Sequence, residues 1–259
     1  DDNNIKEKLF LICDFVKNYF KTQFNESDFG RTIARTYFDE RGFDDETLEK
    51  FDIGTLGSEK FNLRDYCLLN GYDIEDLEAL GLVSSKTQMD IYRSRLIFPI
   101  KSISGRTIGF GARILDNNKK SAKYINSPES KIYNKSNVLF GLYNSKNEIV
   151  KKGSCLIAEG YTDVMRFHQI GINNIVSSSG TALTVNQISL IRRLTKNVTM
   201  LFDSDKAGVN ATERAIELLL SQGMNIDICI LPEGEDPDSF GRNKTHDEIN
   251  NYVIENSVD

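Results

Sequence analysis

The stretch SCLIAEGYTDVMRFHQIG, residues 154–171, decides the fold, because a short β-rich apolar run passes directly into an amphipathic helical run. The same alternation of predicted strand and helix continues to residue 234, over NNIVSSSG (173–180), NQISLIRRLT (186–195), NVTMLFDSD (197–205), AGVNATERAIELLLSQG (207–223) and NIDICILPEG (225–234). Strands and helices that alternate in this way predict a parallel sheet with right-handed crossovers. Such a sheet binds its ligands at the carboxyl ends of its strands.

Acidic residues follow three of the predicted strands. In chain order they are Glu159, Asp203, Asp205, Asp236 and Asp238. Positions i and i+2 of an extended segment point to the same side, so each aspartate pair is placed to address one ion or two neighbouring ions. Carboxylates that gather at one edge need a positive partner, and Mg²⁺ with phosphate chemistry suits them.

Three of these acids also have a structural explanation. Asp205 is placed to cap the helix that follows it, and Asp236 and Asp238 are residues of the type that makes turns. A cap or a turn accounts for any one of them taken alone. The metal site is the preferred hypothesis because three acidic groups fall at matched strand ends.

Composition limits the class of protein. A chain of 259 residues, 39% of them hydrophobic, suffices for one large core or two modest ones. No apolar run approaches the ~18 residues that span a membrane, and no signal peptide opens the chain, which begins with Asp1. Four scattered cysteines and two histidines do not form a zinc-site pattern. We therefore expect a fragment of a soluble, intracellular protein with no zinc of its own.

Charge is distributed unevenly along the chain. The net charge is −6, yet residues 90–147 hold eleven Lys and Arg against Asp90, Asp116 and Glu129, a local net of +8. The remainder therefore carries −14. A basic block joined to an acidic one is expected where one part follows a polyanion and the other holds metal ions. The alternative is that these basic residues only solvate an exposed surface.

The region before residue 84 is predicted to be mostly helical. Its first segment carries apolar residues at helical spacing, namely Leu9, Ile12, Cys13, Val16 and Phe20. Asp44 or Asp45 is the candidate N-cap of a further helix, and Gly81 closes another. None of these helices carries a catalytic constellation.

Residues 91–115 change to alternating, β-branched sequence. RLIFPIKSI and RTIGFGARIL predict two strands around a turn at Gly105. Pro99 suits an edge or a strand end, whereas Gly109 and Gly111 indicate a bulge or the close approach of another backbone. The polar, basic and aromatic segment that follows is expected to be an ordered loop with short helical or extended pieces.

Several motifs, taken together, resemble one family. EGYTD, SSSGTALT, LFDSDKAG and PEGEDPDSF resemble the Toprim domain of bacterial DnaG-type DNA primases. RLIFPI, GRTIGFGARIL, KYINSPES, YNKS and LFGLY are similar to the basic, nucleic-acid-handling subdomain of that family. The resemblance runs from about residue 35 to residue 240, in the family's order. One departure is Ser204, where family members often have glycine.

The resemblance implies an α/β fold in three parts. Residues 1–150 would form a helical and basic α+β N-terminal subdomain. Residues 151–245 would form the Toprim α/β subdomain with a mainly parallel sheet, and residues 246–259 would begin a truncated helical region. The zinc module expected before residue 1 and the helicase-binding domain expected after residue 259 are not in the sequence.

The resemblance also implies roles for individual residues. Glu159 would be a metal ligand or general base, Asp163 a supporting acid, and the four later aspartates metal ligands. Residues near the incoming nucleotide and the nucleic acid would be Lys123, Asn126, Ser127 and Lys135. Arg95 and Arg113 would contact the template or nucleotide phosphates, which Arg binds with a bidentate fork. Tyr124 and Tyr133 are candidates to stack on bases, with burial in the core as the alternative.

The activity implied is synthesis of short RNA primers from ribonucleoside triphosphates on single-stranded DNA, which leaves an RNA–DNA hybrid. Mg²⁺ would be the cofactor, with Mn²⁺ as a substitute ion. A monomeric core, a replicative helicase as partner through a further domain, and a cytoplasmic place at the replication fork are also expected. Two alternatives stay open: a Toprim topoisomerase or nuclease, and a non-catalytic module that binds nucleotides or single strands.

Overall fold

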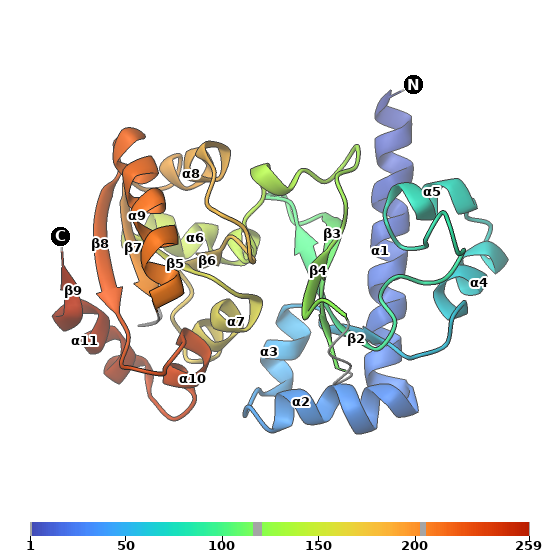
Figure 1. Cartoon of the computed structure of the whole chain (residues 1–259), viewed down its shortest axis with the longest axis horizontal. Coiled ribbons are helices and arrows are strands. Elements are labelled where there is room, and N and C mark those ends of the chain that lie inside the picture. The colour runs from blue at the N-terminus through green and yellow to red at the C-terminus, as the bar shows by residue number, and fades with distance from the viewer. Residues whose placement is uncertain (1, 116–120, 203–205, 259) are drawn as a thin grey trace. The chain divides into compact units, whose positions relative to one another are not determined.

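The structure is a computed structural model that describes residues 2–115, 121–202 and 206–258. The side chains of residues 202 and 206–212 lie outside that description. The chain divides into two compact units, Asp1–Lys135 and Ser136–Asp259 (Figure 1). The first unit contains an antiparallel sheet and the second a mainly parallel one, which confirms the predicted mixed α/β fold.

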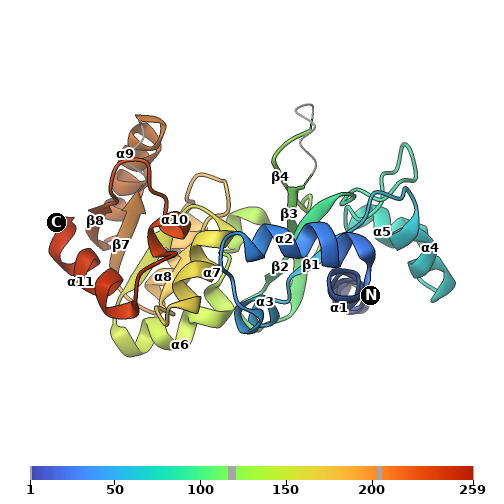
Figure 2. The same cartoon turned by 90° about the horizontal axis from the view of Figure 1, so that it is seen from below.

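The first unit begins with the long helix α1 (Asp2–Glu26). Its buried residues recur every three or four positions, as predicted: Leu9, Ile12, Cys13, Val16, Phe20 and Phe24. This face packs against strands β1 (Gly54–Leu56) and β3 (Thr107–Ile114), as the view along α1 shows (Figure 2). Gly54 permits the close approach, because a Cβ atom at that position would lie 2.5 Å from Phe20 Cβ.

Short helices follow α1. They are the π-helical turn η1 (Gly30–Ala34), α2 (Arg35–Asp39), α3 (Asp45–Lys50), α4 (Asn62–Leu69) and α5 (Ile74–Ala79). Of the two candidate caps, Asp44 caps α3 by accepting a hydrogen bond from Thr47 N at 2.8 Å. Helix α5 ends before Gly81, whose φ of +67° confirms it as the stop. The prediction of helices in this region missed β1, because three residues are too few to show a strand period.

The antiparallel sheet has the order β1–β2–β3–β4, with β2 (Arg95–Lys101) and β4 (Tyr124–Asn126). Strand β1 pairs with β2 only as far as Ile97, so Pro99 lies beyond it and its missing N–H breaks no bond to β1. The bulge falls between Ile100 and Lys101. Gly109 is a point of close approach, because a Cβ atom there would lie 3.1 Å from Ser127 Oγ.

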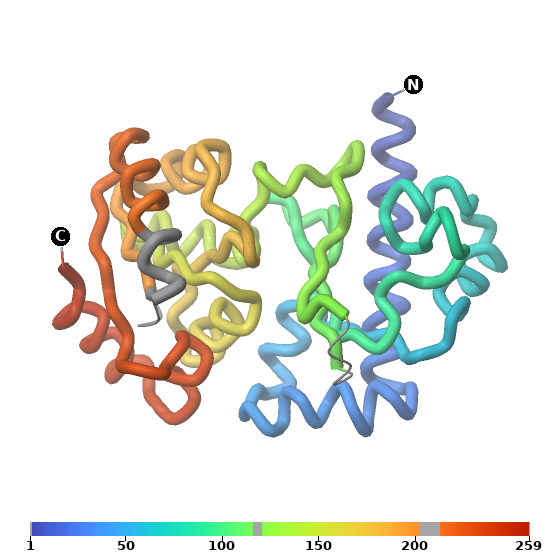
Figure 3. The backbone as a smooth tube through the Cα atoms, in the orientation of Figure 1, coloured from blue at the N-terminus to red at the C-terminus, as the bar shows by residue number. Residues whose placement is uncertain are grey.

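The second unit alternates strand and helix, and the backbone tube lets the reader follow it from yellow-green to red (Figure 3). Its elements are η2 (Lys135–Asn137), which begins at the last residue of the first unit, α6 (Leu142–Lys152), β5 (Cys155–Ala158), α7 (Tyr161–Gln169), β6 (Ile175–Ser177), α8 (Val185–Arg192), β7 (Asn197–Phe202), α9 (Lys206–Ser221), β8 (Asn225–Ile230), α10 (Pro237–Gly241), α11 (His246–Asn256) and β9 (Ser257–Val258). The sheet order is β6–β5–β7–β8–β9, and only β9 runs antiparallel to its neighbour. The parallel sheet predicted from the alternation is confirmed.

The core of the second unit joins helices to alternate strand residues. Ile149 of α6 and Ile191 of α8 belong to the same buried cluster as Cys155, Ile157 and Met200. Helix α6 therefore belongs to the second unit, although the sequence placed residues up to 150 in the first domain. Residues 246–258 also belong to it, since β9 extends the sheet. Within the described residues, no helix has both the length and the apolar character to cross a bilayer.

Candidate active site

A pocket of about 320 Å³ lies at the carboxyl ends of three parallel strands. It is lined by Ile157, Ala158, Glu159, Ser178, Gly180, Thr181, Ala182, Leu183, Met200, Leu201 and Ala215. Glu159 directly follows β5 and is exposed, so its carboxylate is accessible from the pocket side of the sheet. The pocket stands where a sheet of this topology binds its ligands.

The central acidic pair predicted from the sequence is Asp203 and Asp205. Strand β7 ends at Phe202, and Asp203 and Asp205 lie outside the described residues. Within the described part of the chain, no group of three or more His, Cys, Asp or Glu side chains is placed to hold a metal ion.

Asp236 and Asp238 lie at the start of helix α10, the first as its N-cap and the second in its first turn. Asp236 is the exposed N-cap of α10, and its Oδ1 accepts a hydrogen bond from Ser239 N at 2.7 Å. Pro237 occupies the first helical position, which its fixed φ favours. The expectation that the two side chains point to one side as neighbours in a strand is thus wrong. The structural alternative, in which Asp236 forms a turn, matches its position at the start of α10.

Asp238 is buried, with 4% of its surface exposed, and arginines hold both of its carboxylate oxygens. Arg166 Nε donates to Oδ1 at 3.0 Å, and an Arg242 guanidinium nitrogen donates to Oδ2 at 3.1 Å. Asp163 lies beside this group, accepting from Asp238 N at 3.2 Å and from Gly160 N at 2.8 Å. Asp163 therefore links the loop after β5 to α10.

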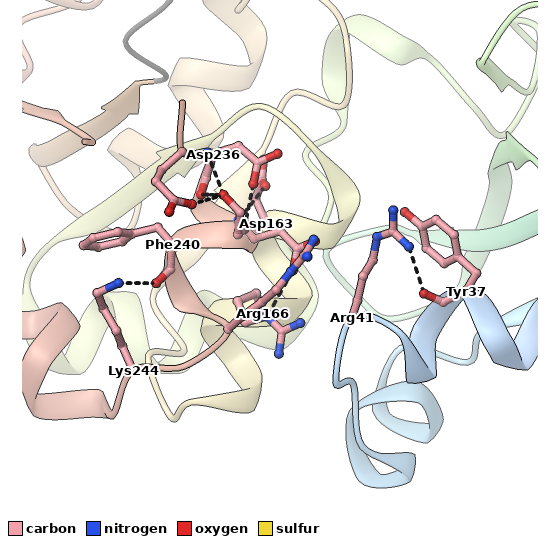
Figure 4. Close-up of polar contacts among 11 residues, drawn as sticks. Tyr37, Arg41, Asp163, Arg166, Asp236, Phe240 and Lys244 are labelled. Carbon is pink, nitrogen blue, oxygen red and sulfur yellow. Dashed lines mark hydrogen bonds and ion pairs between the residues drawn. The ribbon is translucent and has the colours of Figure 1, made fainter. Parts of the chain in front are cut away.

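The sequence reasoning did not single out Arg166. It lies on α7 with only 1% of its surface exposed. A signal existed, because Arg166 stands between the apolar residues Met165 and Phe167, and a charged residue buried beside them requires a charged partner. Figure 4 shows Asp163 and Arg166 of α7 beside Phe240 of α10 and Asp236, the N-cap of that helix.

In the first unit, the predicted basic residues differ in exposure. Arg95 is buried, and its guanidinium donates to the carbonyls of Ala122 and Lys123 at 3.1 and 3.5 Å. Its burial lowers the pKa of Arg95 below the ordinary value. Lys123, in contrast, is exposed, with Nζ 6.0 Å from the ring centre of the exposed Tyr124. Lys123 and Tyr124 are therefore accessible to a ligand, while Arg95 holds the chain that carries them.

Three further predicted residues follow in or after β4. Asn126 is half-buried at the end of the strand. Ser127 is buried, and its hydroxyl accepts from Phe110 N at 2.9 Å and lies 3.0 Å from Tyr92 Oη. Lys135 is half-buried, and its backbone N donates to Glu129 Oε1 at 2.9 Å.

A second residue that sequence reasoning missed is Arg41, which lies against the ring of Tyr37. Its guanidinium carbon is 3.8 Å from the ring centre, and its Nη1 donates to the Tyr37 carbonyl at 3.0 Å (Figure 4). Arg113 packs on the same ring at 4.4 Å. Tyr37 of α2 thus contacts two cationic groups, Arg41 just after that helix and Arg113 of β3. Of these two, Arg113 was predicted to contact phosphates. The i, i+4 spacing of Tyr37 and Arg41 was the available signal. Tyr133 is buried, which favours the core alternative for that ring.

The second unit is a Toprim-like domain, because the model of that family matches residues 156–241. The model of the N-terminal domain of the DNA primase catalytic core matches residues 19–146. The chain belongs to the DnaG-type DNA primase family, as the sequence predicted.

Relatives across the family support this assignment. The chain is 38% identical to a DNA primase of Aquifex aeolicus over 95% of this chain and 49% of that protein. It is 40% identical to a DNA primase of Clostridium acetobutylicum over 97% of this chain and 41% of that protein. The chain therefore spans about half the length of these relatives, or less. A solved DnaG primase catalytic domain bound to single-stranded DNA matches with a TM-score of 0.87 and 32% identity, over 98% of this chain and 82% of that one.

Proposed function

We propose that this chain is the catalytic core of a DNA primase, which joins ribonucleoside triphosphates into short RNA primers on single-stranded DNA. The observation that carries the proposal is the position of Glu159 at a pocket where the strands of a Toprim-like sheet end. The relatives that share both domains are DNA primases, and one similar catalytic domain was solved with single-stranded DNA.

The carboxylates at this edge suit Mg²⁺, with Mn²⁺ as a substitute, because a hard cation prefers carboxylate oxygens together with phosphate oxygens and water. We propose Glu159, Asp203, Asp205 and Asp236 as the residues that hold it. When bound, such an ion stabilises the charge on the reacting phosphate and on the pyrophosphate that leaves. Glu159 is exposed at the end of β5, so it is also accessible to a 3′-hydroxyl whose proton must be removed.

In the first unit, we propose that the template binds through its phosphates to the exposed basic residues. Lys123 supplies a charge and Tyr124 supplies a ring for a base to stack on. Arg113 and Arg41, both packed on Tyr37, extend the set of basic groups. Arg95 contributes indirectly, because its guanidinium fixes the carbonyls of the segment that presents Lys123.

The test is primer synthesis by Asp203→Asn and Asp205→Asn variants, with Mg²⁺ or Mn²⁺, on a single-stranded template. Both variants are expected to lose activity while keeping the thermal unfolding of the parent chain. Asp227→Asn is the matched control, because Asp227 is an exposed aspartate in the middle of β8 and does not line the pocket at the strand ends. Wild-type activity in both variants would refute the metal assignment. Metal-dependent cleavage of DNA in place of primer synthesis would favour a Toprim nuclease.

A further inference from the structure

A buried network of charges joins helix α7 to helix α10. Arg166 of α7 and Asp238 of α10 form an ion pair at 3.0 Å, with 1% and 5% of their side-chain surfaces exposed. Arg242 closes the network at 3.1 Å from the other carboxylate oxygen. Asp163 accepts from the backbone N of Asp238 and so adds a second link between the same two helices.

Helix α10 packs closely against the side chain of Arg166. A Cβ atom at Gly241 of α10 would lie 2.6 Å from Arg166 Cγ and 3.1 Å from its Cδ. Only a residue without a side chain lets α10 approach the arginine stem this closely. The ion pair and the stem therefore set the position of α10 on α7 together.

The network reaches two of the proposed metal ligands through the backbone. Asp163 Oδ2 accepts from Gly160 N, directly after Glu159. Asp163 Oδ1 accepts from Asp238 N, two residues after Asp236, and Asp236 itself caps the same short helix. Fixing α10 on α7 therefore fixes the chain next to Glu159 relative to the chain next to Asp236.

We propose that Arg166 and Asp238 are positioning residues for the metal site, and that Asp238 anchors α10 rather than binding the ion. The inference rests on the proposed function, in which Glu159 and Asp236 hold the metal. Both oxygens of Asp238 already accept from arginines, whereas Asp236 is exposed. A buried charge that loses its partner destabilises a protein strongly, while replacing both partners by apolar residues of similar size is often tolerated. If Asp238 only anchors α10, replacing both charged partners should therefore restore what replacing one of them loses. If Asp238 binds the ion, it should not.

The experiment is a double-mutant cycle with Arg166→Met, Asp238→Leu and the double variant, measured by Mn²⁺ titration and by thermal unfolding. Each single variant is expected to weaken Mn²⁺ affinity by about 10–100-fold, as loss of a residue that orients a metal ligand does. The double variant is expected to recover most of that affinity and most of the lost unfolding temperature. Lys244→Met is the matched control, because Lys244 contacts the Phe240 carbonyl of α10 without joining the network (Figure 4).

The outcomes are distinct. A double variant that regains its unfolding temperature but binds Mn²⁺ as weakly as Asp238→Leu would show that Asp238 is a ligand and would overturn the inference. Normal Mn²⁺ binding by Arg166→Met would overturn it as well. If a single variant does not fold, Arg166→Lys and Arg242→Gln replace it, since each keeps part of the network and should show a smaller loss in both measurements. Failure of the proposed function gives a different result. The four proteins would then show the expected differences in unfolding temperature and Mn²⁺ affinity, but the parent chain would make no primers.

Discussion

Replacing Ser127 by alanine is expected to destabilise the first unit, because the hydroxyl serves two buried groups. Ser127 is 6% exposed, and its Oγ accepts from Phe110 N at 2.9 Å. It also lies 3.0 Å from Tyr92 Oη, on a tyrosine with no exposed surface. A buried polar group left without a partner costs about 1–3 kcal/mol, so two such groups predict a loss of about 2–4 kcal/mol after partial relaxation.

The assay is urea unfolding of the parent chain, Ser127→Ala, Tyr92→Phe and the double variant. Removing both hydroxyls leaves only Phe110 N without its partner. The double variant should therefore lose less unfolding free energy than the two single variants lose together. The expected coupling between the two residues is about 0.5–3 kcal/mol, the range found for residues in direct contact. The slope of the unfolding free energy with urea should stay constant across the four proteins.

A different result would refute this reasoning. If Ser127→Ala unfolds like the parent chain but binds single-stranded DNA or nucleotide more weakly in a fluorescence titration, the hydroxyl contacts a ligand, as the resemblance implied. If the variant is less stable and binds normally once folded at low temperature, the hydroxyl supports the loop between β4 and η2. The two results cannot both occur.

Two further predictions concern the same unit. Burial, with a smaller effect of Glu129, raises the pKa of Tyr133 to about 12. Since the pKa in the unfolded chain is about 10, the stabilising contribution of Tyr133 should be complete below about pH 10 and lost as the pH rises towards 12. Urea unfolding at increasing pH should show a flatter stability curve in this range for Tyr133→Phe. Lys123→Ala should reduce the slope of log K against log salt for single-stranded DNA by about 0.7, the value for one lost phosphate contact, whereas removal of the exposed Lys151 of α6 should leave that slope unchanged.

The alternation of elements in the second unit could be predicted because its signals are local. Apolar runs such as CLIA and a helix with period 3.6 are readable within one window of sequence, and Gly171 and Gly223 mark the ends of two helices through their positive φ. The burial of α1 followed from the same periodicity. Strand β1 could not be found in this way, because its three residues are placed by pairing with β2 and by contact with α1.

The positions of the site residues were harder to predict, since they depend on contacts distant in the sequence. Asp238 contacts Arg166, which lies 72 residues away in the sequence. The local sequence around either residue does not indicate that the other is its partner. The helix at Asp236 did have a local signal, an N-cap aspartate followed by proline at the first helical position. The expectation of an extended segment overlooked it, because the search was for carboxylates that point to one side.

In both units, the residues that carry the family resemblance do two kinds of work. Glu159, Asp236 and Lys123 are exposed, so a ligand can reach them. Asp163, Asp238, Arg95 and Ser127 are buried. Asp163 accepts from the backbone beside Glu159, and Arg95 donates to the carbonyl of Lys123. Asp238 pairs with Arg166, and Ser127 accepts from Phe110 N. A motif contains both kinds, because a ligand-binding group is useful only where its main chain is fixed. Burial and hydrogen-bond partners therefore divide the residues of these motifs into exposed groups, which we propose bind the ligand, and buried groups, which hold the main chain in place.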